Sequence, residues 1–386
     1  MLRRVLFAIL ALGIISSRLQ AQDNKKVSLK DTLDNALDFS DYLINMHGFI
    51  PWPTIISEPA LGNFGGALAL VFISPKKSMK EEQQFRFPDI NGVGGMYTLN
   101  NSWGVAGLRQ ASIPSIGMRY TVAFGYCDVN MDFYRESEFL GEVKRTFGLK
   151  PWFAMADVNE NVYKHKIFVG LKYIYTKTRI DYHAPLVDSI PIIAEIFDIP
   201  DEFEFDQQLG LLGFYVDVDF RNSMFTPDKG IRWMTTYYTS SSLTASDFEL
   251  DRLETFVNAF FQPYKPWVCG LKAEYQIVTQ DAPFYYYPYL NMRGFPMMRY
   301  QGQQTLLFET EQRFDITRRW SVVGFVGTGR TFSDEDYMKD NTWHVAGGGG
   351  FRYLIARLFG LRMGVDIAVG PDQVSYYIIF GHNWDR

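Results

Sequence analysis

The sequence predicts an all-β protein, a closed antiparallel transmembrane β-barrel of about 16 strands with a short amino-terminal amphipathic helix. From about residue 62 onward the chain alternates apolar and polar residues, in segments near the roughly 10 residues that a tilted strand needs to cross a bilayer. Aromatic residues make up 16% of the chain and glycines number 32, which suits a barrel with aromatic belts. After residue 21 no apolar stretch approaches the length of a spanning helix, so a helical membrane protein is excluded.

The amino terminus predicts export. Arg3 and Arg4 precede an apolar run over residues 5–15, and a short polar segment ends at Ala21. This order is typical of a cleaved secretory signal, because an anchoring helix needs about 20 apolar residues and the run is shorter. We expect three regions: a signal peptide over 1–21, a periplasmic helix and lead-in over 22–58, and an outer-membrane barrel over 59–386.

The segment from Ser28 to Ile44 predicts an amphipathic helix. Leucines recur near helical spacing and aspartates lie between them. Such a helix would pack on the body of the protein, or else form a plug in the lumen or lie at the periplasmic surface. Residues 49–53 follow as an extended lead-in, since Pro51 and Pro53 each disfavour helix at the preceding residue.

The strands of the predicted barrel have one apolar face and one face of charged residues or glycine. The alternation is clearest over residues 166–176, 212–221, 267–277 and 359–369. About fifteen strands can be placed between Gly62 and Trp384, and an extra strand within Asp128 to Asn159 gives sixteen, because both termini on one side require an even number. We expect external loops near 74–90, 180–205 and 280–301, and periplasmic turns near 100–101 and 262–266.

Several classes of function find no support in the sequence. A net charge of −5 argues against a nucleic-acid partner. The five histidines are scattered, with no metal spacing and no nucleophile motif, so we expect no enzyme, no metal and no cofactor. Cys127 and Cys269 fall on opposite faces, which predicts no disulfide. The glycines of Gly347 to Gly350 follow no strand-to-helix pattern and would leave room for a loop inside the barrel.

The stretch from Leu290 to Ile316 carries the most information. It begins with a loop around Arg293-Gly294-Phe295 and continues as a strictly alternating strand. Glu309 and Glu311 fall on the charged face of that strand, which in an outer-membrane barrel faces a polar lumen.

Five segments, taken in order, resemble one family. They are Ser57-Glu58-Pro59 with Gly62, Gly65 and Gly66; Asp219-Phe220-Arg221 followed by Pro227 and Gly230; Arg293-Gly294-Phe295; Glu311-x-Arg313; and Phe380-Gly381 to Trp384. Together they resemble the BamA/TamA-type outer-membrane barrels of the bacterial surface-antigen superfamily, in the reduced branch without amino-terminal POTRA domains. The resemblance covers most of the chain from Ser57 to the carboxyl end.

The resemblance implies insertion or translocation of proteins or lipids at the outer membrane of a Gram-negative bacterium. It implies outer-membrane lipid, nascent outer-membrane proteins or accessory periplasmic proteins as partners, and it places Arg293, Gly294 and Phe295 in the lumen. The first strand, near 63–73, would meet the last, near 374–384, at a seam that opens to template an incoming strand. Glycines loosen strands, so Gly65, Gly66 and Gly381 would weaken this seam, to which Trp384 also belongs.

The chain departs from the family in two places. The segment before Gly62 is too short for a POTRA module. The sequence therefore shows no module that would recognise a client protein. The family has Phe-x-Asp-x-Gly on the strand after the loop strand, whereas this chain reads Phe325-Val326-Gly327-Thr328-Gly329. Arg293 therefore needs another partner, for which Glu309 and Glu311 are the candidates, or it is a solvated loop arginine. The alternative function is a passive pore or structural barrel.

Overall fold

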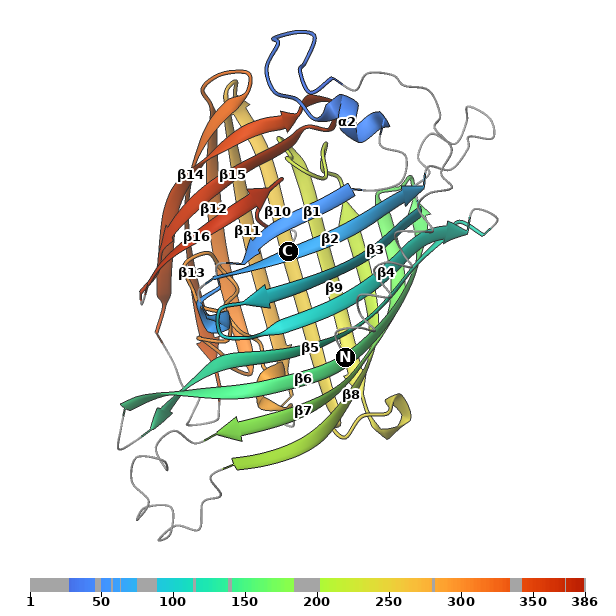
Figure 1. Ribbon diagram of the computed structural model, residues 1–386, viewed down its shortest axis with the longest axis vertical. Coiled ribbons are helices and arrows are strands. Elements are labelled where there is room, and N and C mark those ends of the chain that lie inside the picture. Colours follow the sequence, from blue (N-terminus) through green and yellow to red (C-terminus); the bar gives the residue numbers. More distant parts are fainter. Residues whose placement is uncertain are drawn as a thin grey trace, which may run out of the picture.

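The computed structural model describes residues 28–45, 50–56, 58–62, 64–74, 89–113, 116–137, 141–183, 202–279, 282–333, 342–371 and 373–384. It contains one sheet of 16 strands, each hydrogen-bonded to its neighbours in chain order and antiparallel to them (Figure 1). The first eight are β1 (Ile50–Ile56), β2 (Gly65–Ser74), β3 (Asp89–Thr98), β4 (Trp103–Ile113), β5 (Met118–Ser137), β6 (Gly141–Tyr163), β7 (Ile167–His183) and β8 (Glu202–Asp219). The others are β9 (Gly230–Ser240), β10 (Leu250–Tyr264), β11 (Trp267–Val278), β12 (Gln304–Asp315), β13 (Trp320–Phe332), β14 (His344–Ala356), β15 (Leu361–Val369) and β16 (Val374–Phe380).

The sheet curves into a nearly closed barrel, and the predicted fold class is confirmed. Helical structure in the described residues is limited to short pieces: α2 (Ser40–Asn45), η2 (Pro59–Leu61), η3 (Ser242–Thr244), η4 (Phe284–Tyr286) and η6 (Arg357–Phe359). None of the helices in the described part of the chain is long and apolar enough to cross a membrane. Cys127 and Cys269 are both free thiols. The predicted signal peptide lies outside the described residues.

Two strand predictions were wrong, although the count of sixteen was right. The first strand is β1, which the sequence suggested was only a lead-in, so the sheet begins at Ile50 rather than at residue 59. Proline is tolerated on an edge strand, where its missing N–H faces away from the neighbour. The described residues of Asp128 to Asn159 contain no extra strand, because they belong to β5 and β6, which are 20 and 23 residues long.

These two errors also reversed the expected direction of the first strands. We call the end of the barrel where α2 lies the helix end and the opposite end the loop end. Since neighbouring strands are antiparallel in chain order, β2 ends and β3 begins at the helix end, while residues 99–102 join β3 to β4 at the loop end. The connections after β7 and β11 start at the loop end. The prediction that 74–90 lies at the same end of the barrel as 180–205 and 280–301 was therefore wrong. The prediction that 100–101 and 262–266 share an end was wrong for the same reason.

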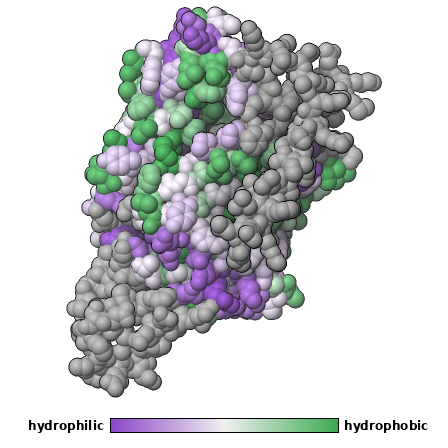
Figure 2. All heavy atoms as spheres, in the orientation of Figure 1, coloured by the Kyte–Doolittle hydropathy of each residue, from purple (hydrophilic) through white to green (hydrophobic). Residues whose placement is uncertain are grey.

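The wall of the barrel alternates as a membrane barrel requires. Along β13, Ser321, Val323 and Phe325 face the lumen and are buried, whereas Val322 and Val326 point outward and are exposed. On the face shown in Figure 2, apolar residues occupy much of the visible wall and hydrophilic residues gather near its upper and lower limits. The two faces predicted for residues 359–369 are also present, with Arg362 and Asp366 buried and Ile367 exposed.

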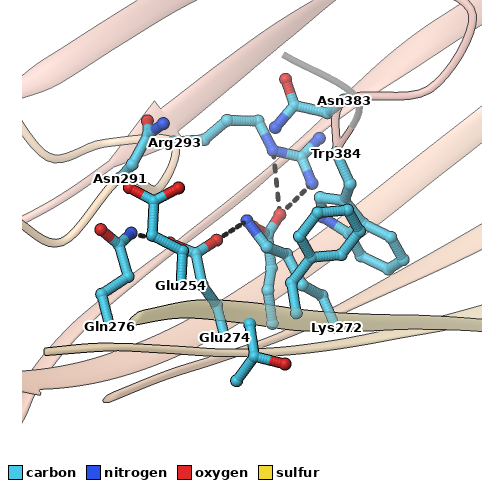
Figure 3. Close-up of a pocket in the computed structure, with 11 residues that line it drawn as sticks. Glu254, Lys272, Glu274, Gln276, Asn291, Arg293, Asn383 and Trp384 are labelled. Carbon is cyan, nitrogen blue, oxygen red and sulfur yellow. Dashed lines mark hydrogen bonds and ion pairs between the residues drawn. The ribbon is translucent and has the colours of Figure 1, made fainter. Parts of the chain in front are cut away.

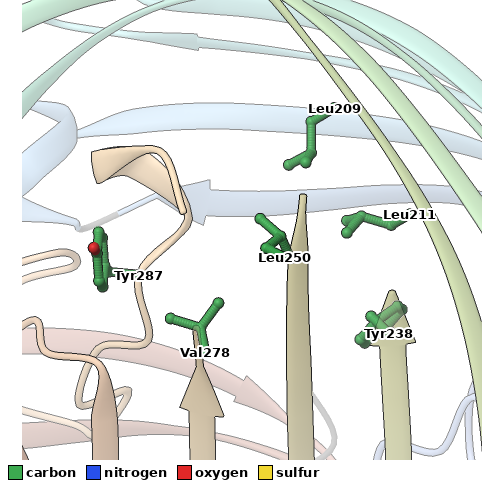
Figure 4. Packing of buried hydrophobic residues seen from close by; sticks show 6 residues of the cluster. All are labelled: Leu209, Leu211, Tyr238, Leu250, Val278 and Tyr287. Atoms are coloured by element: carbon green, nitrogen blue, oxygen red, sulfur yellow. The ribbon is translucent and has the colours of Figure 1, made fainter. Parts of the chain in front are cut away.

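The lumen contains a hydrophobic core built around the connection between β11 and β12. At the loop end, Tyr287 from this connection packs with residues of β8 to β11 (Figure 4). The members of this cluster are Leu209, Leu211, Tyr238, Leu250, Val278 and Tyr287. Phe284, Tyr285 and Met298 pack against a second cluster on β5 to β7. Buried apolar area of this kind is the dominant favourable term in packing, so the connection is part of the folded interior.

Candidate functional site: two ion clusters and a seam

The connection between β11 and β12 enters the lumen as a hairpin. The amide N–H of Leu290 donates to the carbonyl of Tyr300 at 3.0 Å, and that of Gly302 donates to the carbonyl of Pro288 at 3.0 Å. At its tip Gly294 has φ +93°, a conformation that favours glycine, and its N–H donates to Tyr377 Oη on β16 at 3.0 Å. A Cβ added at Gly370 would lie 1.9 Å from Gly294 O. Two glycines thus let the tip contact the turn between β15 and β16.

Arg293 is fully buried at this tip. Its Nε donates to Glu309 Oε1 at 3.1 Å, and its Nη1 lies 2.7 Å from Glu311 Oε2. Figure 3 labels Arg293, and dashed lines mark interactions of its guanidinium group. The same Nη1 donates to Asp366 Oδ2 on β15 at 2.7 Å, and the guanidinium carbon lies 3.6 Å from the centre of the Phe325 ring. A buried guanidinium needs such partners, because desolvating an unpaired charge is costly.

Arg352 on β14 completes a group that we call the lumen cluster: Arg293, Arg352, Glu309, Glu311 and Asp366. Arg352 Nη2 donates to Asp366 Oδ2 at 2.9 Å and lies 3.9 Å from Glu311 Oε2. Two cations and three carboxylates leave one negative charge in excess. The cluster joins the tip of the loop to β12, β14 and β15, which form the wall on the β16 side of the barrel.

Sequence reasoning named Glu309 and Glu311 as partners of Arg293 but missed Asp366 and Arg352. The family's acid would stand at Gly327, where a Cβ would lie 2.2 Å from Met292 Sδ. The loop fills that space, and the carboxylate comes from β15 instead. A Cβ at Gly350 would likewise lie 2.2 Å from Asp366 Oδ1, so the glycine run makes room for the cluster. The available signal was Asp366 itself, a charge on the lumen face of an apolar strand.

A cavity of about 230 Å³ lies beside the lumen cluster. Glu254, Lys272 and Glu274 line it from β10 and β11, and Arg293 lines it from the loop (Figure 3). Trp384 lines it from the carboxyl end. Lys272 is paired with Glu274 at 2.7 Å. The cavity wall is thus charged but internally paired, with no nucleophile, base and orienting group together.

The expected helix over Ser28 to Ile44 is wrong for most of its length. Only α2 is helical, and residues 28–39 form turns with a bridge between Lys30 and Leu37. The aspartate side chains explain this. Asp31, Asp34 and Asp38 each accept a hydrogen bond from the backbone N–H two residues later, at 3.1, 3.1 and 2.7 Å. These local bonds compete with helical ones and outweigh the leucine spacing.

The same aspartates attach the segment to the helix end of the barrel. Arg319, between β12 and β13, contacts Asp34 at 2.7 Å and Asp38 at 2.6 Å, and also pairs with Asp31. Arg357 of η6 pairs with Asp31 as well, at 2.5 Å. We call these five residues the end cluster. The hydrogen bond from Arg319 lowers the pKa of Asp34 to about 2, and that from Arg357 lowers the pKa of Asp31.

The two outermost strands of the sheet meet at a seam. Within the described residues no ladder pairs β1 with β16, although some of their Cα atoms lie within 8 Å of each other. The predicted seam residues need correction, because Gly65 and Gly66 lie on β2, opposite Ile56 and Ile55 of β1. The seam strand on the amino-terminal side is β1.

The chain turns inward after β16. Gly381 has φ +77° and its N–H donates to Arg362 O at 2.7 Å. Trp384 then packs inside the barrel on Phe260, with ring centroids 5.4 Å apart, next to Gly270. The prediction that Trp384 belongs to the seam was therefore wrong. Trp384 lies in the interior of the barrel, near β10 and β11.

Known structures share this architecture. BamA from Haemophilus ducreyi lacking POTRA domains 1–3 matches with a TM-score of 0.59 and 11% identity, over 86% of this chain and 69% of that one. CdiB from Escherichia coli matches with a TM-score of 0.59 and 8% identity, over 86% of this chain and 62% of that one. No family model and no curated protein matches the sequence. At these identities the likeness concerns the fold, a BamA-like barrel, and supports an integral outer-membrane location.

The described residues contain no group of three or more His, Cys, Asp or Glu side chains that could hold a metal ion. The site consists of a loop tip that buried charges hold inside the lumen. The tip lies close to a seam whose two strands form no ladder in the described residues.

Proposed function

We propose that this protein assists the insertion or translocation of proteins or lipids at the outer membrane. The observation that carries the proposal is the seam, since an unpaired strand edge is costly in a membrane and attracts another strand. Outer-membrane lipid, nascent outer-membrane proteins and accessory periplasmic proteins are the proposed partners. Export by a signal peptide cleaved after residue 21 and the lack of enzymatic activity belong to the same proposal.

The lumen cluster supports the proposal by its position. It fixes the loop tip to β12, β14 and β15, and Gly294 reaches Tyr377 on β16, so the cluster holds the β16 side of the seam in place. The β1 side has no contact of this kind among the described residues: there, Met297 N–H donates to Glu58 Oε1 at 2.8 Å, beyond the end of β1. The β16 side of the seam is therefore fixed from within by buried charges, whereas the contact on the β1 side lies outside the strand itself.

The test is a liposome assay with purified, folded protein. The measurements are the folding rate of an unrelated barrel protein added unfolded, and mixing of lipid between leaflets. We expect acceleration by the wild type and its loss in Arg293→Ala. Arg109→Ala is the matched control, since Arg109 is an exposed arginine on β4, hydrogen-bonded to Asn91 and Tyr120.

Two outcomes would overturn the proposal. Folded protein that accelerates neither process would leave a scaffold, or a chain that acts only with a partner. Large, steady conductance in planar bilayers that is the same with residues 282–303 present or deleted would indicate a passive pore.

A further inference from the structure

The two strands at the seam differ in what their backbones offer. Just before β2, the carbonyl of Phe64 accepts from Leu99 N–H at 2.8 Å, which continues the β2–β3 register beyond its first pair, Gly65 with Thr98. Backbone groups alternate in direction along an antiparallel strand. Even-numbered residues of β2 therefore bond to β3, and odd-numbered ones bond to β1.

The register of β1 then fixes which of its residues point toward the seam. Ala67 and Ala69 of β2 stand opposite Thr54 and Trp52, so the even-numbered residues of β1 bond to β2. The backbone groups of Pro51, Pro53 and Ile55 point toward β16. Proline has no N–H. Of these three positions, only Ile55 can donate a hydrogen bond across the seam.

The edge of β16 has a full set of donors. Gly370 N–H donates to Gln373 O and Gly381 N–H donates to Arg362 O, at 2.9 and 2.7 Å, so odd-numbered residues of this strand bond to β15. The backbone groups that point toward the seam belong to Val374, Tyr376, Ile378 and Phe380. None of these is proline, so each carries an N–H and a carbonyl.

We propose that β16 is the edge that accepts an incoming strand. The prolines of β1 exclude β1 from this role. The inference rests on the proposed function and specifies which edge acts. A proline-free strand beside β16 can match the donors and acceptors of that edge at every position, whereas β1 lacks two of three donors. An incoming strand that replaces β1 therefore completes the ladder better than β1 does.

The chemistry of the seam identifies the partner as a transmembrane strand of another barrel protein. Val374 points outward and is 52% exposed, whereas Ser375, Tyr377 and Ile379 are buried on the lumen side. An added strand has to continue both faces, with apolar residues toward lipid and small or polar residues toward the lumen. Because β16 runs from the loop end to the helix end, the strand runs antiparallel, from the helix end to the loop end, as β1 does.

The test compares two positions near the loop end of the seam. Val374→Cys lies on β16 and Ile55→Cys lies on β1; both side chains point outward, and they are 52% and 46% exposed. Each is made with Cys127 and Cys269 replaced by serine. The probe is an unfolded barrel protein with single cysteines along its terminal strands, added to liposomes under mild oxidation. We expect disulfides to form several-fold faster at 374 than at 55.

Two further variants test the edge assignment without relying on a single crosslink. Ile378→Pro removes a donor from the edge of β16 and should lower both crosslinking at 374 and acceleration of client folding. Pro51→Ala with Pro53→Ala returns donors to β1, so we expect tighter pairing with β16 and slower client capture. Faster capture in the double variant, with crosslinks at 55, would overturn the inference.

The outcomes separate this inference from the proposed function. Client folding accelerated with crosslinks only at 55 would overturn the edge assignment and leave the function standing. Crosslinks at 374 without acceleration would support the edge assignment and count against the function. Folded protein that forms crosslinks at neither position would overturn the assignment.

Discussion

The lumen cluster and the end cluster have the same composition, two arginines and three carboxylates, and they differ in where the charges lie. In the lumen cluster Arg293 and Asp366 have fully buried side chains. In the end cluster the side chains of Arg319, Asp31 and Asp38 are at most 6% exposed, but that of Arg357 is 37% exposed and that of Asp34 is 25% exposed, so water reaches one edge of the cluster. Water and salt screen exposed ion pairs and barely reach buried ones. The same chemistry should therefore act as a permanent attachment in the lumen and as a reversible one at the end.

The clusters also differ in which side supplies the cations. In the lumen one arginine of the loop meets acids of the wall, whereas at the helix end three aspartates of one segment meet arginines of the connections between strands. Removing Arg293 thus leaves buried carboxylates behind in the strands. Removing the amino-terminal aspartates leaves arginines at a surface, where water can solvate them. The following predictions test this difference, beginning with the largest effect.

Arg293→Ala should cost the most stability. Of the lumen cluster's two cations, Glu309, Glu311 and Asp366 would keep only Arg352, and breaking a buried pair typically costs about 3–5 kcal/mol. Denaturant unfolding of the purified barrel in lipid vesicles measures the loss. Arg109→Ala should change little. A loss below about 1 kcal/mol, the range of surface pairs, would mean that water reaches the carboxylates of the lumen cluster.

Gly294→Ala should have a smaller effect on the same loop. A side chain at φ +93° is strained, and a Cβ there would lie 3.1 Å from Ala346 Cβ. Strain of this kind costs about 1–3 kcal/mol, and the charges of the cluster would remain paired. Protease protection of residues 282–303 reports whether the tip stays in place. Gly117→Ala is the control, since Gly117 also has a positive φ but meets nothing within 4 Å.

Arg319→Ala should release residues 28–45 without destabilising the barrel. Arg319 contacts three aspartates of the segment, so its loss leaves the segment with the Arg357–Asp31 pair and with neutral hydrogen bonds such as that from Phe39 N–H to Ile355 O. We expect faster proteolysis of the segment and an unchanged unfolding midpoint of the barrel. Arg318→Ala, at the neighbouring position, is the control. A barrel destabilised as much as by Arg293→Ala would remove the distinction between the two clusters.

How far the sequence could predict these features depends on the range of the interactions. Period-two alternation is local, so it predicted the barrel and placed Glu309 and Glu311 on the face that Arg293 reaches. Asp366 joins the site only through the register of β14 with β15, which a single strand does not encode. The end cluster was hidden because leucines at helical spacing compete with aspartate turns over the same residues. β1 was missed because prolines disfavour strands except at an edge, and an edge is a property of the whole sheet.

Lowering the pH should have the smallest effect, and it should release the end cluster while the lumen cluster stays intact. The pKa of Asp34 in the attached segment is about 2, below the value of about 3.9 for a free aspartate. A lowered pKa stabilises the attached state above the free pKa, and the stabilisation is lost as the pH falls through the lowered one. The segment should stay attached down to about pH 4 and detach toward pH 2, sooner at high salt.

A fluorescent label on Ser28→Cys would follow detachment while the barrel's unfolding is monitored separately. Asp34→Asn is the matched variant, because it removes the group that titrates while keeping its size, and its attachment should be weaker at neutral pH and change less with acid. Release near pH 6 would implicate a histidine rather than these aspartates. Since Arg319 bonds to all three aspartates at once, protonating one carboxylate weakens the attachment of the whole segment, and the transition should be a single step.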